Sequence, residues 1–215
     1  MDPETAFLSG LIELQYGQKV EEKLKRIAAA IPWARGWPDN KTAFWNAEAF
    51  MWQRKIDQKT RTQIEDELAF LNNGKNLDIG CGAYSYLPSV AGLDLSEEML
   101  TLNDRLQQKV VHDLEKRLPF PAGSFDSVTA IFVLNYITRY EKLLREIQRV
   151  LTGKGLLVAV VSSKPINDWQ RQKEVNTFSA EEWRSALEQA GFKVNVQPQK
   201  ALLFFHCCKR AAKTI

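Results

Sequence analysis

The sequence predicts an α/β protein with a doubly wound, mostly parallel seven-stranded sheet, a C-terminal antiparallel hairpin and an N-terminal helical extension. Three observations predict this fold. Apolar residues recur at helical spacing through the first 73 residues. From Lys75 onward, short apolar runs alternate with helical patterns, as in parallel sheets that are covered on both faces. Near the C-terminus, two apolar runs are joined by a turn that is too short for a parallel crossover.

The length of 215 residues favours one domain with an appendage. Hydrophobic residues make up 45% of the chain and charged residues 26%, which is typical of a protein with a buried core. We expect the helical extension, a lid over the main domain, to cover residues 1–73. The main domain is expected to cover residues 74–215.

The first third is expected to hold two long helical stretches. One covers residues 7–31 and is weakened by its glycines. An irregular connection rich in tryptophan and proline follows. A second stretch over residues 45–71 has one continuous apolar face, and Asn72-Asn73-Gly74 ends it in a turn.

The remaining elements follow from the alternation of apolar runs and caps. Ser96 is expected to begin one helix, and a second is expected over 140–151. Ser179 and Glu182 form a predicted capping box at the start of the last helix. The strands are expected at residues 76–79, 90–95, 109–112, 127–134, 156–161, 193–196 and 201–207.

Composition argues against several classes of protein. Three cysteines, two of them adjacent, do not form a disulfide framework and favour a reducing compartment. No cysteine pair has zinc-site spacing, so no metal is expected, and His112 and His206 are expected to be structural. The first residues are acidic, unlike a signal peptide, and no apolar run approaches the ~20 residues of a membrane span. The expected location is cytoplasmic, with no membrane association.

The charge distribution does not indicate a nucleic-acid partner, although it permits one. The net charge is +3, and residues 164–215 alone carry +4 without any dense basic run. A duplex-binding protein usually concentrates its basic residues in a stripe that neutralises phosphates.

The stretch from Leu77 to Gly82 carries the most chemical information. A strand turns there into a Gly-x-Gly loop, where the backbone can approach a ligand closely. Ser85 stands where a dinucleotide fingerprint needs its third glycine. Asp78 would repel phosphates but suits an ammonium group, and Asp94 ends the next strand, where an acid accepts hydrogen bonds from ribose hydroxyls. The pattern favours a cationic, ribosylated ligand over a dinucleotide.

The sequence resembles the class I S-adenosylmethionine-dependent methyltransferases of the type 11 group, which includes methyltransferases of ubiquinone and menaquinone biosynthesis. The resemblance covers about residues 76–192. It rests on LDIGCG at 77–82, GLDLSEEML at 92–100, HDLEKRLPFPAGSFDSV at 112–128, EIQRVLTGKGLLVAV at 146–160 and FSAEEWRSALEQAGF at 178–192. Together, the order and spacing of these motifs make it specific.

The resemblance implies S-adenosylmethionine as the cofactor and a Rossmann-like domain that binds it. Asp78 would hold the methionine end through the loop and ordered water, and Asp94 would bind the ribose. Asn135 and Tyr136 would lie near the departing methyl group. The other expected cofactor contacts are backbone groups of Gly80, Cys81 and Gly82, adenine packing by Leu95 and Met99, and hydrogen bonds from adenine to Asp113 and Leu114.

One position departs from the family pattern. Tyr84 replaces the third glycine of the loop, so the first helix of the domain is expected to be shortened or reshaped. Four tryptophans in the extension, at positions 33, 37, 45 and 52, are mainly expected to be core anchors. At most one is expected to contact ligand, with Trp45 and Trp52 as the better candidates.

The favoured function is methyl transfer to a small molecule by proximity and orientation, because the sequence offers no convincing general base. RNA or protein could be the acceptor instead. A non-catalytic subunit that binds S-adenosylmethionine is a third possibility, and a nicotinamide-dependent oxidoreductase is disfavoured by the missing glycine. The oligomeric state is left open.

Overall fold

The computed structural model describes residues 2–87, 89–163 and 171–210, and it confirms the predicted fold class. Seven strands form one sheet in the order β3-β2-β1-β4-β5-β7-β6. The first five strands run parallel, and β7 is antiparallel to both of its neighbours. The strands are β1 (Asn76–Ile79), β2 (Ser89–Asp94), β3 (Leu106–Val111), β4 (Phe125–Ile131), β5 (Leu151–Ser162), β6 (Phe192–Gln199) and β7 (Leu202–Lys209).

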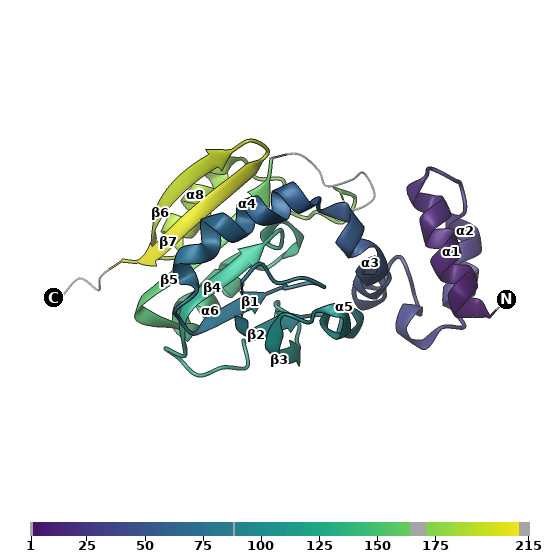
Figure 1. Ribbon diagram of the computed structural model, residues 1–215, viewed down its shortest axis with the longest axis horizontal. Helices are drawn as coiled ribbons and strands as arrows, with labels where there is room; N and C mark the ends of the chain where they lie inside the picture. Colours follow the sequence, from purple (N-terminus) through teal and green to yellow (C-terminus); the bar gives the residue numbers. More distant parts are fainter. Residues whose placement is uncertain (1, 88, 164–170, 211–215) are drawn as a thin grey trace.

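Both faces of the central strands are buried, as their apolar sequences predict, whereas the edge strand β3 is largely exposed. Along β5, Ala159 packs into a cluster with α6 (Tyr140–Val150) and α8 (Ala180–Gln189). Val158 and Val160 pack on the opposite face against α4 (Gln58–Leu68). Since successive side chains of a strand point to opposite faces, each face needs its own layer of helices. Figure 1 shows α4 lying along the sheet opposite α6 and α8.

Several predicted strand boundaries are wrong by three to five residues. β5 begins at Leu151 instead of residue 156, because Leu151 pairs with Phe125 before an irregularity in the ladder restores the register at Ser127 and Leu156. β4 ends at Ile131 instead of residue 134. Phe132 has a φ of 57° and turns the chain into the 3₁₀ helix η3 (Leu134–Tyr136). Such a backbone conformation cannot continue a strand.

The two predicted helical stretches of the extension are four helices. The first splits into α1 (Pro3–Gln15) and α2 (Glu21–Ala28). The second splits into α3 (Lys41–Lys55) and α4, and Asp57 at the break caps α4 by accepting a 2.9 Å hydrogen bond from the Thr60 amide. An N-cap acid stabilises the start of a helix, so two helices form here although the apolar periodicity continues across the break between them.

The N-terminal helices form a small core of their own. Phe7 and Leu24, which belong to α1 and α2, pack with Trp37 and Phe44. The 3₁₀ helix η1 (Pro32–Ala34) joins the cluster through Ala34. In Figure 1, α1 and α2 lie at the opposite end of the molecule from the β6–β7 hairpin, and α3 connects them to the sheet. They therefore support α3 from the side that faces away from the sheet.

The helices α5 and α8 begin at the cap residues that the sequence predicts. Ser96 caps α5 (Glu97–Leu102) by accepting a 3.0 Å hydrogen bond from the Met99 amide. The predicted capping box of Ser179 and Glu182 is present at the start of α8. The 3₁₀ helix η2 (Ala69–Leu71) continues α4 toward the sheet. Within the described ranges, no helix combines the length and apolar character needed to cross a membrane.

Trp183 of α8 offers a test of the packing on one face of the sheet. Its side chain is 1% exposed and contacts the rings of Tyr140 and Phe178. We expect Trp183→Ala to lower the free energy of unfolding by about 3–5 kcal/mol, because it leaves a large cavity. Ser179→Ala at the cap of the same helix should cost only about 1 kcal/mol. Urea unfolding curves of both variants measure the difference, and equal losses would contradict this packing.

Candidate functional site

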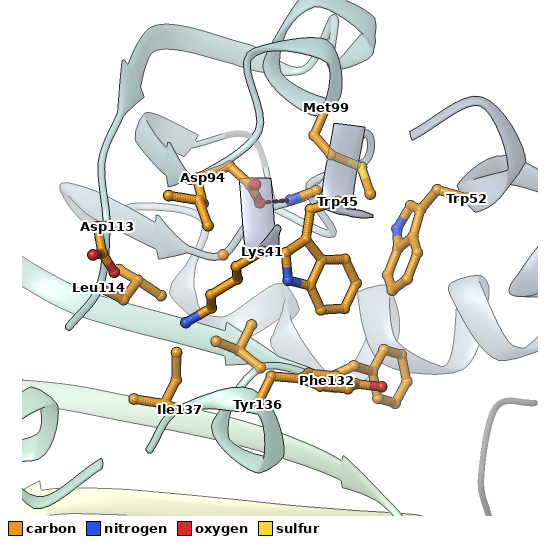
Figure 2. Close-up of a pocket in the computed structure, with 14 residues that line it drawn as sticks. Lys41, Trp45, Trp52, Asp94, Met99, Asp113, Leu114, Phe132, Tyr136 and Ile137 are labelled. Atoms are coloured by element: carbon orange, nitrogen blue, oxygen red, sulfur yellow. Dashed lines mark hydrogen bonds between the residues drawn. The ribbon is translucent and has the colours of Figure 1, made fainter. Parts of the chain in front are cut away.

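A cavity opens at the carboxyl ends of β1, β2 and β4, beneath α3 (Figure 2). It holds about 570 Å³ of empty space, part of it open to solvent, which is within the usual range for small-molecule sites. In doubly wound sheets, ligands bind at this edge. The lining residues are Lys41, Trp45, Trp52, Gly80, Gly82, Asp94, Leu95, Met99, Asp113, Leu114, Phe132, Val133, Tyr136 and Ile137.

The turn after β1 forms one wall, and it requires glycine. Gly80 and Gly82 have φ values of 60° and 57°, a region that side chains disfavour. A Cβ on Gly80 would lie 2.6 Å from Cγ2 of Val133. A Cβ on Gly82 would lie 3.1 Å from the indole nitrogen of Trp52. The backbone of this turn therefore packs closely against the Val133 side chain, which follows β4, and the Trp52 side chain of α3.

Asp94 holds this turn and also lines the cavity. One carboxylate oxygen accepts a 2.9 Å hydrogen bond from the Gly82 amide, and the other accepts a 2.9 Å bond from the Ser96 amide. Burial raises the pKa of this carboxyl to about 6, and the two amides oppose that shift. A carboxylate offers about four acceptor positions, so Asp94 can still accept from two hydroxyl groups.

Asp78 lies behind the turn and is not among the lining residues. Its carboxylate accepts a 2.9 Å hydrogen bond from the Thr129 hydroxyl. Burial raises its pKa to about 6, a hydrogen bond with Ser85 opposes the shift, and the nearby charge of Asp94 adds to it. The geometry is compatible with an indirect role through the loop, and that role stays a prediction.

Cys81 also points away from the cavity, into the protein. Its amide donates a 3.0 Å hydrogen bond to the Leu93 carbonyl, so this amide is engaged within the protein. Burial raises the pKa of the thiol well above its usual range, so the group packs as a neutral side chain. The predicted backbone contact of Cys81 with a cofactor stays a prediction. Among the described residues, no cluster of side chains could hold a metal ion.

The contacts of Tyr84 explain how the fold accommodates a tyrosine in place of the third glycine of the loop. No helix follows the turn within residues 80–87, so the predicted shortening of the first helix is a complete loss. The guanidinium groups of Arg61 and Arg105 lie 4.4 and 4.7 Å from the centre of the Tyr84 ring, and its hydroxyl donates to Glu65. Tyr84 therefore fastens the loop to α4, which covers this face of the sheet in place of the lost helix.

The inner face of α3 covers the cavity. Lys41, Trp45 and Trp52 are four and seven residues apart, so they lie on one side of the helix and project into the site (Figure 2). The Ser96 hydroxyl donates a 2.7 Å hydrogen bond to Asn46, which joins α3 to the Asp94 turn. Both favoured tryptophans thus line the cavity, whereas Trp33 and Trp37 belong to the N-terminal core. Whether one or both contact ligand stays a prediction.

The predicted adenine-binding residues all line the cavity, but not at one end. Asp113 and Leu114 lie with Ile137 at one end (Figure 2), Leu95 follows β2, and Met99 of α5 lies nearer Trp45 and Trp52. Asp113 also accepts a 3.0 Å hydrogen bond from the Glu115 amide, which fixes its local turn. An apolar slot with a carboxylate at its edge suits a flat heterocycle that bears an amino group.

The two weak catalytic candidates lie at different places. Tyr136 lines the cavity and packs edge-on against Trp45, with ring centres 4.9 Å apart. Burial raises the pKa of its phenol, so the hydroxyl stays protonated and can donate a hydrogen bond. Asn135 is not a lining residue, and its amide group donates a 2.8 Å bond to Glu174.

Sequence reasoning missed several residues that shape the site. Lys41 was overlooked although it lies one helical turn before Trp45, on the same face. Phe132 and Val133 were assigned to a strand, and their place at the cavity wall follows from the turn at Phe132. Asn103 donates to the Gly82 carbonyl at 2.9 Å and braces the turn, although no local sequence signal marks it.

The strand order, the glycine turn after β1 and the cavity beyond it define the fold of class I methyltransferases. Residues 77–159 match the family model described as a methyltransferase domain. The predicted resemblance to methyltransferases is therefore confirmed over this part of the chain.

Similar proteins agree with this assignment. A demethylmenaquinone methyltransferase of Staphylococcus saprophyticus is 31% identical over 120 residues, which are 49% of this chain and 52% of that protein. One of Listeria welshimeri is 33% identical over 124 residues, with 49% and 52% covered. The chain therefore spans about half the length of these curated relatives.

Solved structures share the fold at low sequence identity. A putative methyltransferase from Haloferax volcanii, solved in complex with the Trm112 methyltransferase activator, has a TM-score of 0.62 at 19% identity. The match covers 78% of this chain and 98% of that one. A SAM-dependent methyltransferase from Archaeoglobus fulgidus has a TM-score of 0.62 at 14% identity and covers 74% and 99%.

Gly80 and Gly123 allow a matched test of the crowded turn. Both have positive φ values, of 60° and 66°, but a Cβ on Gly123 would meet nothing within 4 Å. Gly123→Ala should lower the free energy of unfolding by about 1–2 kcal/mol through backbone strain alone. Gly80→Ala should cost a further 1–3 kcal/mol or so, because the methyl group overlaps Val133. Equal losses in chemical denaturation would mean that the turn is not closely packed.

Proposed function

We propose that this chain is an S-adenosylmethionine-dependent methyltransferase that acts on a small molecule. The observation that carries the proposal is the position of Asp94. Its carboxylate is largely shielded from bulk solvent, is fixed beside a glycine turn, and lines a cavity at the carboxyl edge of the sheet. The methyltransferase domain match and the small-molecule acceptor in the names of the relatives support it.

The residues of the cavity fit the cofactor. Asp94 would accept hydrogen bonds from the ribose hydroxyls, and the slot between Leu95, Leu114 and Ile137 would hold the adenine. The Gly80–Gly82 turn, which a Cβ would block, gives the methionine end close access to the backbone. Asp113 would accept from the adenine amino group. When bound, S-adenosylmethionine supplies an electrophilic methyl group.

The chain would then act mainly by positioning and by excluding water. Trp45 and Trp52 cover the cavity from α3, and Tyr136 stands beside Trp45 with a protonated hydroxyl. These groups would keep the site dry and orient an acceptor toward the methyl group, and orientation alone accounts for a large share of such catalysis. The two carboxylates that line this cavity, Asp94 and Asp113, are assigned to the cofactor, so an acceptor that ionises readily is favoured.

Ligand-induced thermal stabilisation tests the cofactor assignment directly. S-adenosylmethionine or S-adenosylhomocysteine should raise the melting temperature of the wild-type chain, whereas NAD and ATP should not. Asp94→Asn keeps the shape of the side chain but weakens acceptance from hydroxyl groups, so affinity should fall by about tenfold or more. Asp126→Asn, on an exposed carboxylate at the far end of β4, is the control and should bind normally. Stabilisation by NAD alone would refute the proposal.

The raised pKa values of Asp78 and Asp94 predict opposite pH trends for stability and binding. Between about pH 4 and pH 6, the folded chain retains protons that the unfolded chain has lost. These two groups therefore make the ligand-free protein less stable as pH rises through that window. Affinity for S-adenosylhomocysteine should instead increase as pH rises through about 6, because the ionised Asp94 is the better acceptor.

Calorimetric titrations and melting curves from about pH 4.5 to about pH 8 measure both trends, since this range extends from the ordinary pKa of a carboxyl group to well above the raised one. Asp94→Asn should remove most of the pH dependence of binding. A binding constant that does not change between about pH 5 and pH 7 in the wild-type protein would contradict the assignment of Asp94 to the ribose.

A further inference from the structure

A second cavity adjoins the proposed cofactor site. It holds about 460 Å³ of empty space, part of it open to solvent, between the start of α3, the segment after β4 and the segment that leads to α8. Lys41, Trp45 and Tyr136 line both cavities, so these side chains form the border between them. The other lining residues are Pro38, Asp39, Phe44, Thr138, Lys173 and Val175.

The walls of this second cavity are largely aromatic and apolar. Phe44 packs edge-on against Trp45 with ring centres 5.1 Å apart, and Trp45 packs in the same way against Tyr136. Pro38 is buried, whereas Val175 is 52% exposed and stands where the cavity meets solvent. Phe44 is 1% exposed, so Trp45 and Tyr136 provide most of the aromatic surface for a flat apolar molecule.

One ammonium group, that of Lys173, lies against this apolar surface. Lys173 donates a 2.9 Å hydrogen bond to the Pro38 carbonyl and lies 5.2 Å above the centre of the Phe44 ring. An ammonium has three N–H donors, so this one can donate to a ligand as well. Lys41 lies 3.6 Å from Glu115, which already accepts hydrogen bonds from Arg139.

The carboxylates around the second cavity offset the charge of Lys173 only in part. Asp39 lines it, but this residue is exposed to solvent, where its charge is screened. Glu48 forms a buried ion pair with Lys55. Glu174 keeps its charge, because the 2.8 Å hydrogen bond that it accepts from Asn135 comes from a neutral amide, but Glu174 does not line the cavity. The partly buried Lys173 ammonium is therefore the main charge that a ligand would meet beside the aromatic rings.

We propose that the second cavity binds the methyl acceptor, and that this acceptor is a flat aromatic acid whose anionic group is held by Lys173. The proposal rests on the proposed function, because the shared wall of Trp45 and Tyr136 places such a ligand next to the cofactor cavity. The rings stack against the aromatic body, and Lys173 orients it by a charge-assisted hydrogen bond. A hydroxyl group on the ring edge that faces Tyr136 would take the methyl group: its oxygen bonds to the methyl carbon as the S–CH3 bond of S-adenosylmethionine breaks, S-adenosylhomocysteine leaves, and the hydroxyl proton passes to solvent.

Binding of a simple aromatic acid and its neutral ester tests this proposal. The probes are 1-hydroxy-2-naphthoate and its methyl ester, titrated calorimetrically into the wild-type chain that is saturated with S-adenosylhomocysteine. The acid should bind about tenfold or more tightly than the ester. Lys173→Met should abolish that preference, and Lys173→Arg should restore most of it because the charge is kept. Lys154→Met, on an exposed lysine near the start of β5, should behave as the wild type.

The outcomes separate this proposal from the proposed function. Normal binding of S-adenosylhomocysteine shows that each variant is folded and that the first cavity is intact. If the acid and the ester then bind equally, or if neither binds, the aromatic-acid proposal is overturned while the cofactor site stands. A preference for the acid that survives in Lys173→Met overturns it as well, because the anion would then bind elsewhere. Failure of S-adenosylhomocysteine to bind the wild type would instead refute the proposed function.

Discussion

The Asp94 carboxylate is the interaction on which the site depends. It accepts hydrogen bonds from the Gly82 amide on one side and the Ser96 amide on the other, so it joins the turn after β1 to the start of α5. Ser96 in turn donates to Asn46 of α3. Through these hydrogen bonds, Asp94 links the glycine turn, the start of α5 and, by way of Ser96, helix α3. Its pKa is raised because burying the charged carboxylate costs free energy that the hydrogen bonds from backbone amides do not fully offset.

The departure at Tyr84 is accommodated without loss of the cavity. In this chain the helix expected after β1 is absent from residues 80–87, and α4 covers that face of the sheet through Ile64 and Leu68. Tyr84, held between two arginines, secures the loop to α4. The N-terminal helices are therefore part of the architecture of the site: α4 replaces a missing layer, and α3 covers the cavity.

The border between the two cavities follows from the same arrangement. Trp45 and Tyr136 come from α3 and from the segment after β4, which are about ninety residues apart in the sequence, and their rings meet edge-on. If the first cavity holds the nucleoside and the second the acceptor, this pair of rings decides how closely the two ligands can approach. In that case α3 and the segment after β4 would determine which acceptor binds, whereas the sheet determines the cofactor site.

The sequence by itself determined the sheet and its parallel and antiparallel parts, because alternation, caps and glycines act locally. The same local signals indicated Asp94, Gly80 and Gly82, the family resemblance indicated Tyr136, and all four line the cavity. The sequence could not determine the loss of the helix after β1, the break between α3 and α4, or the roles of Lys41 and Lys173. Those features depend on contacts between segments distant in the chain, such as Tyr84 with Arg61 and Lys173 with Pro38. Only the tertiary structure decides them, because side chains brought together by packing leave no periodic pattern in the sequence.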